Sequence, residues 1–218
     1  MNNYTSPDKA HLALVIIDTQ QDFVIPGTPG FIPGTMEALP RMARLVERFR
    51  QKGLPIVHVV RLYLEDGSNV DLCRRAAVAQ GLKMVVPGSA GAEIMEELKP
   101  FPQVRLDAPL LLSGRLQAIG PREWFMYKPR WGAFYQTPLE QRLRDLGVNT
   151  LALCGCNFPN CPRTTIYEAS ERDFKIILVR DAVSGVYEAA LREMQNIGVS
   201  LMTAGECLAW LEGNKVKS

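Results

Sequence analysis

The chain has 218 residues, of which 47% are hydrophobic and 22% are charged, and its formal net charge is +2. These values are typical of a soluble globular protein, and the length suits a single domain over residues 1–218. The sequence lacks both the basic stripe of a nucleic-acid-binding protein and the apolar span of about 20 residues that crosses a membrane. We therefore expect neither a nucleic acid nor a membrane as a partner.

The five cysteines are odd in number and irregularly spaced. This pattern favours reduced thiols in a cytosolic setting over a disulfide framework. Residues 1–11 are polar and lack the apolar stretch of a secretory signal. We therefore expect a cytoplasmic protein.

The first predicted element is a strand over residues 12–18, a nearly continuous apolar run that ends in the carboxylate of Asp18. Such runs are typical of strands that are buried on both faces of a parallel sheet. Further strands are predicted at residues 53–60, 124–127, 151–154, 175–179 and 199–202, and helices at residues 35–52, 90–98, 138–146, 162–172, 186–197 and 205–211.

This alternation of strands and helices predicts an α/β fold. We expect a doubly wound, Rossmann-like three-layer sandwich around a central six-stranded, mostly parallel sheet. The segment at residues 61–123 is long for a connection between a strand and a helix. It is interpreted as an ordered loop with short helices that covers the edge of the sheet.

Three chemically capable side chains follow predicted strands that lie far apart in the chain. Asp18 ends the first strand, Lys128 follows the strand at residues 124–127, and Cys161 follows the strand at residues 151–154. Ligands of doubly wound sheets bind at the carboxyl ends of the strands, so the topology brings these residues to one edge. Together they supply a base, a cation and a thiol, which can activate a nucleophilic cysteine. Taken singly, Asp18 also fits a helix N-cap and Lys128 a solvated charge.

Cys161 precedes Pro162, which fits the first position of the predicted helix at residues 162–172. A helix N-terminus favours an anion, so we expect the pKa of this thiol to fall from ~8.5 towards neutrality, which would make it the most reactive thiol of the chain. Most free cysteines are instead inert core residues, the interpretation favoured for Cys73, Cys154 and Cys207. The run Cys154-x-Cys156-x4-Cys161 lacks the spacing of a zinc site.

Several stretches, in chain order, carry a family resemblance. They are Asp18-Thr19-Gln20-Gln21-Asp22-Phe23, residues 128–134, Gly155-Cys156-Asn157-Phe158-Pro159-Asn160-Cys161, and Arg180-Asp181-Ala182-Val183-Ser184. Together they resemble the isochorismatase-like cysteine hydrolase superfamily. The resemblance covers nearly the whole chain as one hydrolase domain.

The resemblance implies a catalytic triad of Asp18, Lys128 and Cys161. It also implies a cis peptide bond between Cys156 and Asn157. The backbone N–H groups of Asn157 and Cys161 would then form the oxyanion hole.

Nicotinamidases of this superfamily carry an Asp/His/His metal site near the second strand. This chain has only two histidines, His11 before the first strand and His58 inside the second, and no Asp-x-His follows. His58 is interpreted as a packed strand residue. We therefore expect no catalytic metal and no cofactor.

These features predict a metal-independent amidohydrolase that cleaves a C–N bond of a small amide, carbamoyl or ureido compound through a thioester. One alternative is an isochorismatase-type hydrolase that acts on a vinyl ether without a cysteine nucleophile. Another is a non-catalytic scaffold that uses the same fold for assembly.

The candidate substrate-binding residues are aromatic and basic. The aromatic candidates Phe23, Trp131, Phe134 and Phe158 fit a pocket wall and a plain core equally well. Arg74, Arg75 and Arg163 are candidates for binding a substrate carboxylate, although a solvated face is the favoured interpretation for Arg74 and Arg75.

The C-terminal half carries more apolar positions than one narrow helix stripe requires, and surplus exposed apolar area tends to mark an interface. The positions are Tyr167, Ala169, Phe174, Val186 and Tyr187. Together with the family resemblance, they predict a homodimer or homotetramer.

Overall fold

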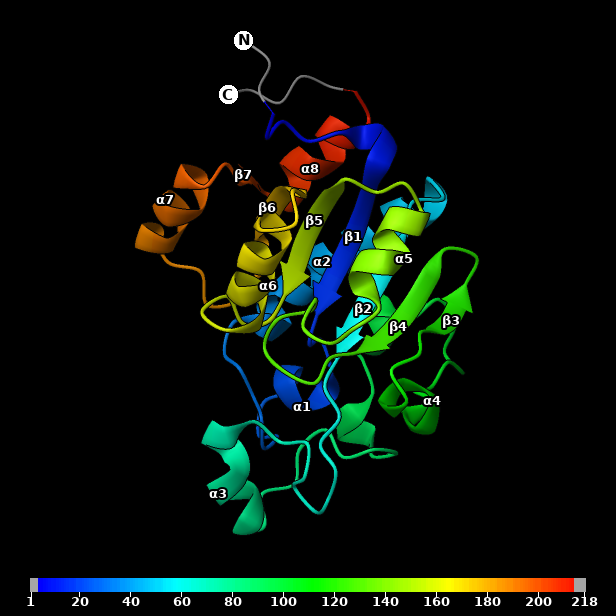
Figure 1. Ribbon diagram of the computed structural model, residues 1–218, viewed down its shortest axis with the longest axis vertical. Helices are drawn as coiled ribbons and strands as arrows, with labels where there is room; N and C mark the ends of the chain where they lie inside the picture. Colours follow the sequence, from blue (N-terminus) through cyan, green and yellow to red (C-terminus); the bar gives the residue numbers. More distant parts are fainter. Residues whose placement is uncertain (1–3, 214–218) are drawn as a thin grey trace.

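The computed structural model describes residues 4–213, and within this range seven strands form one sheet (Figure 1). The central strands β1 (Leu12–Ile17), β2 (Ile56–Val60) and β5 (Thr150–Gly155) are buried at every residue, as expected for strands covered on both faces. The remaining strands are β3 (Gln117–Gly120), β4 (Glu123–Tyr127), β6 (Lys175–Val183) and β7 (Ser200–Met202).

The strand order is β3-β4-β2-β1-β5-β6-β7, and all neighbours are parallel except β3 and β4. The α/β class and the mostly parallel sheet are confirmed, but the described sheet has seven strands where six were predicted. The additional strand is β3, an antiparallel edge strand of four residues, none of which is fully buried. The sequence Gln117-Ala118-Ile119-Gly120 has no apolar run, so it gave no strand signal.

The order of connections reverses beside β1. The chain passes from β1 to β2 and β4 on one side, and then returns to β5 on the other side of β1. Such a reversal opens a crevice at the carboxyl ends of the two strands. Gly155 ends β5 at a backbone φ of 119°, and a Cβ there would collide with the backbone of Ile17. Glycine at this position lets β1 and β5 end in close contact.

Helices cover both faces of the sheet (Figure 1). On one face α2 (Thr35–Gln51) contacts β1, β2, β5 and β6, and α8 (Ala204–Leu211) contacts β6 and β7. On the other face α6 (Cys161–Ser170) contacts β5 and β6, beside α5 (Leu139–Asp145), while α7 (Glu188–Asn196) packs against β7. α2 buries Ala38, Met42, Leu45 and Phe49, a spacing of three to four residues that gives one apolar face.

The segment between β2 and β3 lies largely beyond the carboxyl ends of the strands, near α1 (Gln21–Val24) (Figure 1). It contains the short helices α3 (Arg75–Ala79) and α4 (Ala108–Leu112) and the 3-10 turn η2 (Leu72–Arg74). A further 3-10 turn, η1 (Lys9–His11), precedes β1.

The helix predicted at residues 90–98 is wrong. The chain forms two 3-10 turns there, η3 (Ala90–Ala92) and η4 (Glu96–Leu98). Between them Ile94 pairs with Gln20 in an isolated antiparallel bridge. This tertiary pairing requires extended backbone and therefore interrupts the helix.

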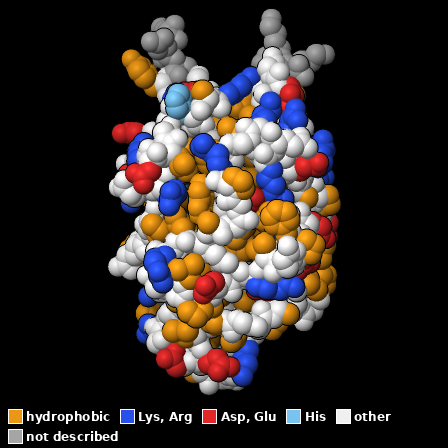
Figure 2. Space-filling view, turned by 90° about the vertical axis from the view of Figure 1, so that its right-hand side faces the viewer, with side chains coloured by type: hydrophobic (Ala, Val, Ile, Leu, Met, Phe, Trp, Pro, Cys, Tyr) orange, Lys and Arg blue, Asp and Glu red, His pale blue; other side chains and the backbone are white. Residues whose placement is uncertain are grey.

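The surface on the β3–β4 side carries basic, acidic and apolar side chains interspersed with one another (Figure 2). Over residues 4–213, helices long and apolar enough to cross a membrane are absent.

Candidate active site

Asp18 lies directly after β1 and turns the chain out of the sheet. Its backbone φ is 53°, the left-handed region that few residues other than glycine adopt, and its N–H donates to the Val59 carbonyl at 2.9 Å. Residues in such conformations often lie at functional sites. The Asp18 side chain is buried where β1 ends beside β5.

Lys128 follows β4, and its N–H donates to the Val60 carbonyl at 3.0 Å. Its side chain is fully buried. The Nζ atom lies 2.9 Å from Asp18 Oδ2, 3.3 Å from Cys161 Sγ and 3.3 Å from the Arg130 carbonyl oxygen. An ammonium group has three N–H donors, so these three acceptors satisfy it. The three predicted residues therefore meet in space, with the lysine between the acid and the thiol.

The electrostatics of this cluster favour a charged lysine beside a neutral thiol. Burial lowers the pKa of Lys128, but Asp18 and then Cys161 raise it, with a net rise, so the ammonium stays charged. Burial, followed by the negative charge of Asp18, raises the pKa of Cys161 to about 12, against the opposing effect of Lys128. The expected lowering of this pKa at a helix N-terminus is therefore wrong. The desolvation of a 7% exposed thiol outweighs the helix and the cation.

The turn between β5 and α6 holds the thiol against the two strand ends. The peptide bond between Cys156 and Asn157 is cis, at the position that the family resemblance implied. The N–H of Cys156 donates to Ile17, and the N–H of Phe158 donates to Ser184. Within the described residues, the N–H groups of Asn157 and Cys161 have no such backbone acceptor.

The Gln20 side chain hydrogen-bonds the turn after β1 to two neighbouring segments, a role that was not predicted from the sequence. Its side-chain oxygen accepts from the Arg61 N–H at 2.7 Å, and its side-chain nitrogen donates to the carbonyls of Arg61 and Ala92, both at 2.7 Å. The sequence did contain one indication of this role, because Gln20 lies inside the motif at residues 18–23. These bonds hold the loop after β2 next to Asp18.

A cavity of about 270 Å³ lies beside the Cys156–Cys161 turn. It is lined by Asn157, Asn160, Arg74, residues 29–32, Leu82 and Met84. The cavity therefore lies between the turn that precedes Cys161 and the segment after β2.

The four aromatic candidates do not line this cavity. Phe134 and Phe158 belong to the main core, where Phe134 packs against Phe174 and Phe158 meets Tyr187 edge-on. Phe23 is buried in the same small cluster as Met84. Trp131 is half-buried and lies under the guanidinium of Arg74. Phe134 and Phe158 pack inward, as in the plain-core interpretation, and their assignment to the substrate pocket stays a prediction.

The three arginine candidates have different surroundings. Arg74 is half-buried and lines the cavity, so the solvated-face interpretation is wrong for it. Arg75 is exposed, as favoured from the sequence. The Arg163 guanidinium lies 2.5 Å from the Glu193 carboxylate and donates to the Tyr187 hydroxyl at 2.5 Å. Its N–H groups are therefore engaged by side chains at the surface and not by the cavity.

Of the positions expected at a subunit interface, Ala169 and Phe174 are buried within the chain itself. Tyr167 and Tyr187 are exposed. The exposed apolar area of this face is therefore smaller than the sequence indicated, because two of the five positions are buried in the core of the chain itself.

The remaining cysteines also differ. Cys154 and Cys207 are buried core residues, as predicted, and Cys156 is buried as well. Cys73 is exposed, so its assignment to the core is wrong. It lies in η2, a turn outside the main sheet layers.

Alkylation should therefore reach Cys73 before Cys161. At pH 7, iodoacetamide should modify the exposed Cys73, while the buried, protonated Cys161 reacts slowly. Raising the pH should increase the Cys161 rate by about tenfold per unit, because the thiolate is the nucleophile. Peptide mapping by mass spectrometry measures both rates, with Cys154 as the unreactive internal control. Faster labelling of Cys161 than of Cys73 at pH 7 would show a depressed pKa and contradict this electrostatic description.

The two histidines lie in separate environments. His58 is buried, with Nε2 2.6 Å from Glu123 Oε1, which confirms a packed strand residue. His11 Nδ1 lies 2.8 Å from Asp8. Over residues 4–213, clusters of three or more His, Cys, Asp or Glu side chains able to hold a metal ion are absent.

Glu123 should make the protein sensitive to acid. Burial raises its pKa, but hydrogen bonds from Arg50 and His58 outweigh this and lower it from 4.5 to about 2. A lowered folded-state pKa stabilises the protein above pH 4.5, and this contribution is lost as the pH falls towards 2. Glu123→Gln should therefore lower the free energy of unfolding by about 3 kcal/mol at pH 7 and by much less at pH 3.

Urea denaturation at both pH values measures this difference. Glu65→Gln is the control, because the Glu65–Lys83 pair is exposed and should contribute less than about 1 kcal/mol. An equal loss for Glu123→Gln at pH 7 and pH 3 would mean that the carboxylate charge does not supply the stability.

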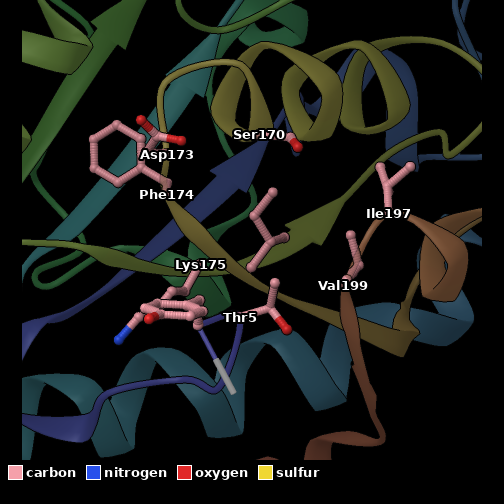
Figure 3. A pocket seen from close by; sticks show the side chains of 10 residues that line it. Thr5, Ser170, Asp173, Phe174, Lys175, Ile197 and Val199 are labelled. Atoms are coloured by element: carbon pink, nitrogen blue, oxygen red, sulfur yellow. The ribbon is translucent and has the colours of Figure 1, made fainter. Parts of the chain in front are cut away.

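A cavity of about 410 Å³ lies elsewhere, where Phe174, Lys175, Ile197 and Val199 surround the starts of β6 and β7 (Figure 3). Cys161 instead follows the carboxyl end of β5, which is parallel to β6. The larger cavity is therefore at the opposite edge of the sheet from the acid–lysine–thiol cluster.

Comparison with known proteins agrees with this architecture. The family model described as Isochorismatase domain matches residues 12–107 and 115–206. A probable inactive nicotinamidase of Arabidopsis thaliana is 29% identical over 200 residues, which cover 89% of this chain and 93% of that protein. Maleamate amidohydrolase of Pseudomonas putida is 30% identical over 177 residues, which cover 78% of this chain and 71% of that protein.

Among solved structures, an isochorismatase family protein from Desulfovibrio vulgaris is 32% identical and superposes with a TM-score of 0.79. The match covers 93% of this chain and 98% of that chain. Fold and site thus define a hydrolase built on a doubly wound sheet. The chain belongs to the isochorismatase family, which confirms the family expected from the sequence motifs.

Proposed function

We propose that the protein is a metal-independent cysteine amidohydrolase that cleaves the C–N bond of a small amide, carbamoyl or ureido compound. The observation that carries this proposal is the fully buried Lys128 ammonium, which lies between Asp18 at 2.9 Å and Cys161 at 3.3 Å. A buried lysine that touches both a carboxylate and a thiol can hold the acid in place and stabilise a thiolate as it forms. The complete cluster supports an active hydrolase, even though one relative is described as probably inactive.

In the first step the Cys161 sulfur attacks the carbonyl carbon of the substrate while Asp18 takes the thiol proton. Asp18 Oδ1 suits this role because it is buried and has no hydrogen-bond partner within the described residues. The carbonyl oxygen becomes an oxyanion, to which the N–H groups of Asn157 and Cys161 donate. Each such donor contributes about 3 kcal/mol to the barrier reduction in other acyl-transfer enzymes.

In the second step the C–N bond breaks and Asp18 returns the proton to the leaving nitrogen, which departs as ammonia or an amine. The acyl group stays on Cys161 as a thioester. Water then attacks the thioester and gives one proton to Asp18, which passes it to the departing sulfur. The products are the acid and the original thiol.

The test is ammonia release from a panel of small amides and ureides, with Cys161→Ala and Cys73→Ala as a matched pair. Cys161→Ala should abolish turnover, and the exposed Cys73→Ala should retain it. Mass spectrometry of quenched reactions should find the acyl group on the Cys161 peptide. Hydrolysis of a vinyl ether that survives Cys161→Ala would favour the isochorismatase-type reaction, and a lack of turnover across the whole panel would favour a non-catalytic scaffold.

A further inference from the structure

Arg74 belongs to the segment after β2 and lines the cavity beside the Cys156–Cys161 turn. Its guanidinium carbon lies 5.2 Å from the ring centre of Trp131, which follows Lys128 by three residues. Its Nη1 donates to the Tyr63 hydroxyl at 2.6 Å. A ring face and a hydroxyl therefore hold this guanidinium in one orientation at the cavity wall.

The free edge of this guanidinium can accept a ligand. Nε and Nη2 form none of the hydrogen bonds found among the described residues, and the side chain is 27% exposed. These two nitrogens project parallel N–H groups from one edge of an arginine side chain. That edge matches the two oxygens of a carboxylate in a bidentate pair.

The carboxylates paired with Arg74 and its cationic neighbours do not neutralise all of these cations. Arg61 is paired with Asp71 at 2.5 Å, and Lys128 is paired with Asp18. Among the described residues, Arg61, Arg74 and Lys128 share two carboxylates, with Asp71 3.9 Å from Arg74. Arg61 and Lys128 are buried, so the excess positive charge is accessible at Arg74.

The same cavity joins Arg74 to the reacting turn, because both Arg74 and Asn157 line it. A ligand in it can therefore place a carbonyl near the N–H groups of Asn157 and Cys161 while another group meets Arg74. The rest of the lining includes the apolar side chains of Leu82 and Met84, which suit a short carbon chain between the two groups.

We propose that Arg74, supported by Trp131 and Tyr63, binds a carboxylate of the substrate, so that the protein prefers small amides that also carry a carboxylate. This inference rests on the proposed amidohydrolase function and names the substrate class of that site. Arg74 is the specificity-determining residue, and Trp131 and Tyr63 are positioning residues.

The first experiment compares succinamate, a four-carbon amide with a carboxylate, with its neutral diamide, succinamide. The wild-type protein should favour succinamate in kcat/KM. In Arg74→Gln the ratio of the two kcat/KM values should fall by about tenfold or more, mainly through a higher KM for succinamate. Arg74→Lys should restore part of the ratio, because lysine keeps the positive charge but lacks the two parallel N–H groups of the guanidinium. Arg75→Gln, an exposed neighbour, should keep the wild-type ratio.

A parallel decrease for both amides in Arg74→Gln would show a structural role and overturn the proposal, as would an unchanged ratio. The second experiment separates this inference from the reaction itself, by titrating succinate into the Cys161→Ala variant and recording binding by calorimetry. Adding Arg74→Gln should weaken binding by tenfold or more. Absence of ammonia release together with Arg74-dependent succinate binding would reject the amidohydrolase and retain the carboxylate site, whereas succinate binding that is absent or independent of Arg74 would reject the carboxylate site.

Discussion

Replacing Asp18 with Asn should lower kcat by about 10²- to 10⁴-fold, the usual contribution of a general acid–base group. Asn cannot take the Cys161 proton, and with a thiol pKa near 12 very little thiolate is present at neutral pH without this transfer. The amide oxygen can still accept from Lys128, so the fold should be retained. Ammonia release measures kcat, and circular dichroism measures folding.

Asp22→Asn is the matched control, because it changes a second buried carboxylate of the same motif. Asp22 Oδ2 accepts from the Val85 N–H at 2.6 Å, a bond that an amide oxygen can also accept. We expect Asp22→Asn to lower kcat by far less than Asp18→Asn does. Near-normal turnover in a folded Asp18→Asn variant would remove Asp18 from the mechanism.

Replacing Lys128 with Met should both abolish turnover and destabilise the fold. The side chain is fully buried, and its loss removes the ion-pair partner of the buried Asp18 carboxylate. Removal of one partner of a buried ion pair costs about 3–5 kcal/mol. Urea denaturation should therefore show a large loss in the free energy of unfolding, which a solvated lysine at a strand end would not produce.

The double variant Asp18→Asn/Lys128→Met tests this explanation. With both charges removed, it should recover much of the stability lost in Lys128→Met while remaining inactive. Two additive losses would mean that the stability of Lys128 comes from packing and not from its pair with Asp18.

The sequence by itself indicated which residues meet at the site. Asp18, Lys128 and Cys161 each follow an apolar run that predicts a buried strand. Because parallel strands place their carboxyl ends at one edge of the sheet, this topology rule predicted that the three residues lie close together. The Cys156–Asn157 cis bond entered only through the family resemblance. The main strands and α2 were predicted from the same kind of evidence, because burial on one or both faces of an element determines the spacing of its apolar residues.

Only the tertiary structure decided what depends on three-dimensional surroundings. The pKa of Cys161 is raised because of the atoms that bury it and the carboxylate beside it, and neither is readable from the local helix start. Ile94 is extended because Gln20 pairs with it across 74 residues of chain, and Arg74 faces the cavity because Trp131 and Tyr63 hold it there. The local sequence pattern reflects which residues are buried and at what spacing along each element. Shifts in pKa, desolvation and long-range pairing depend instead on contacts between segments that are distant in the chain.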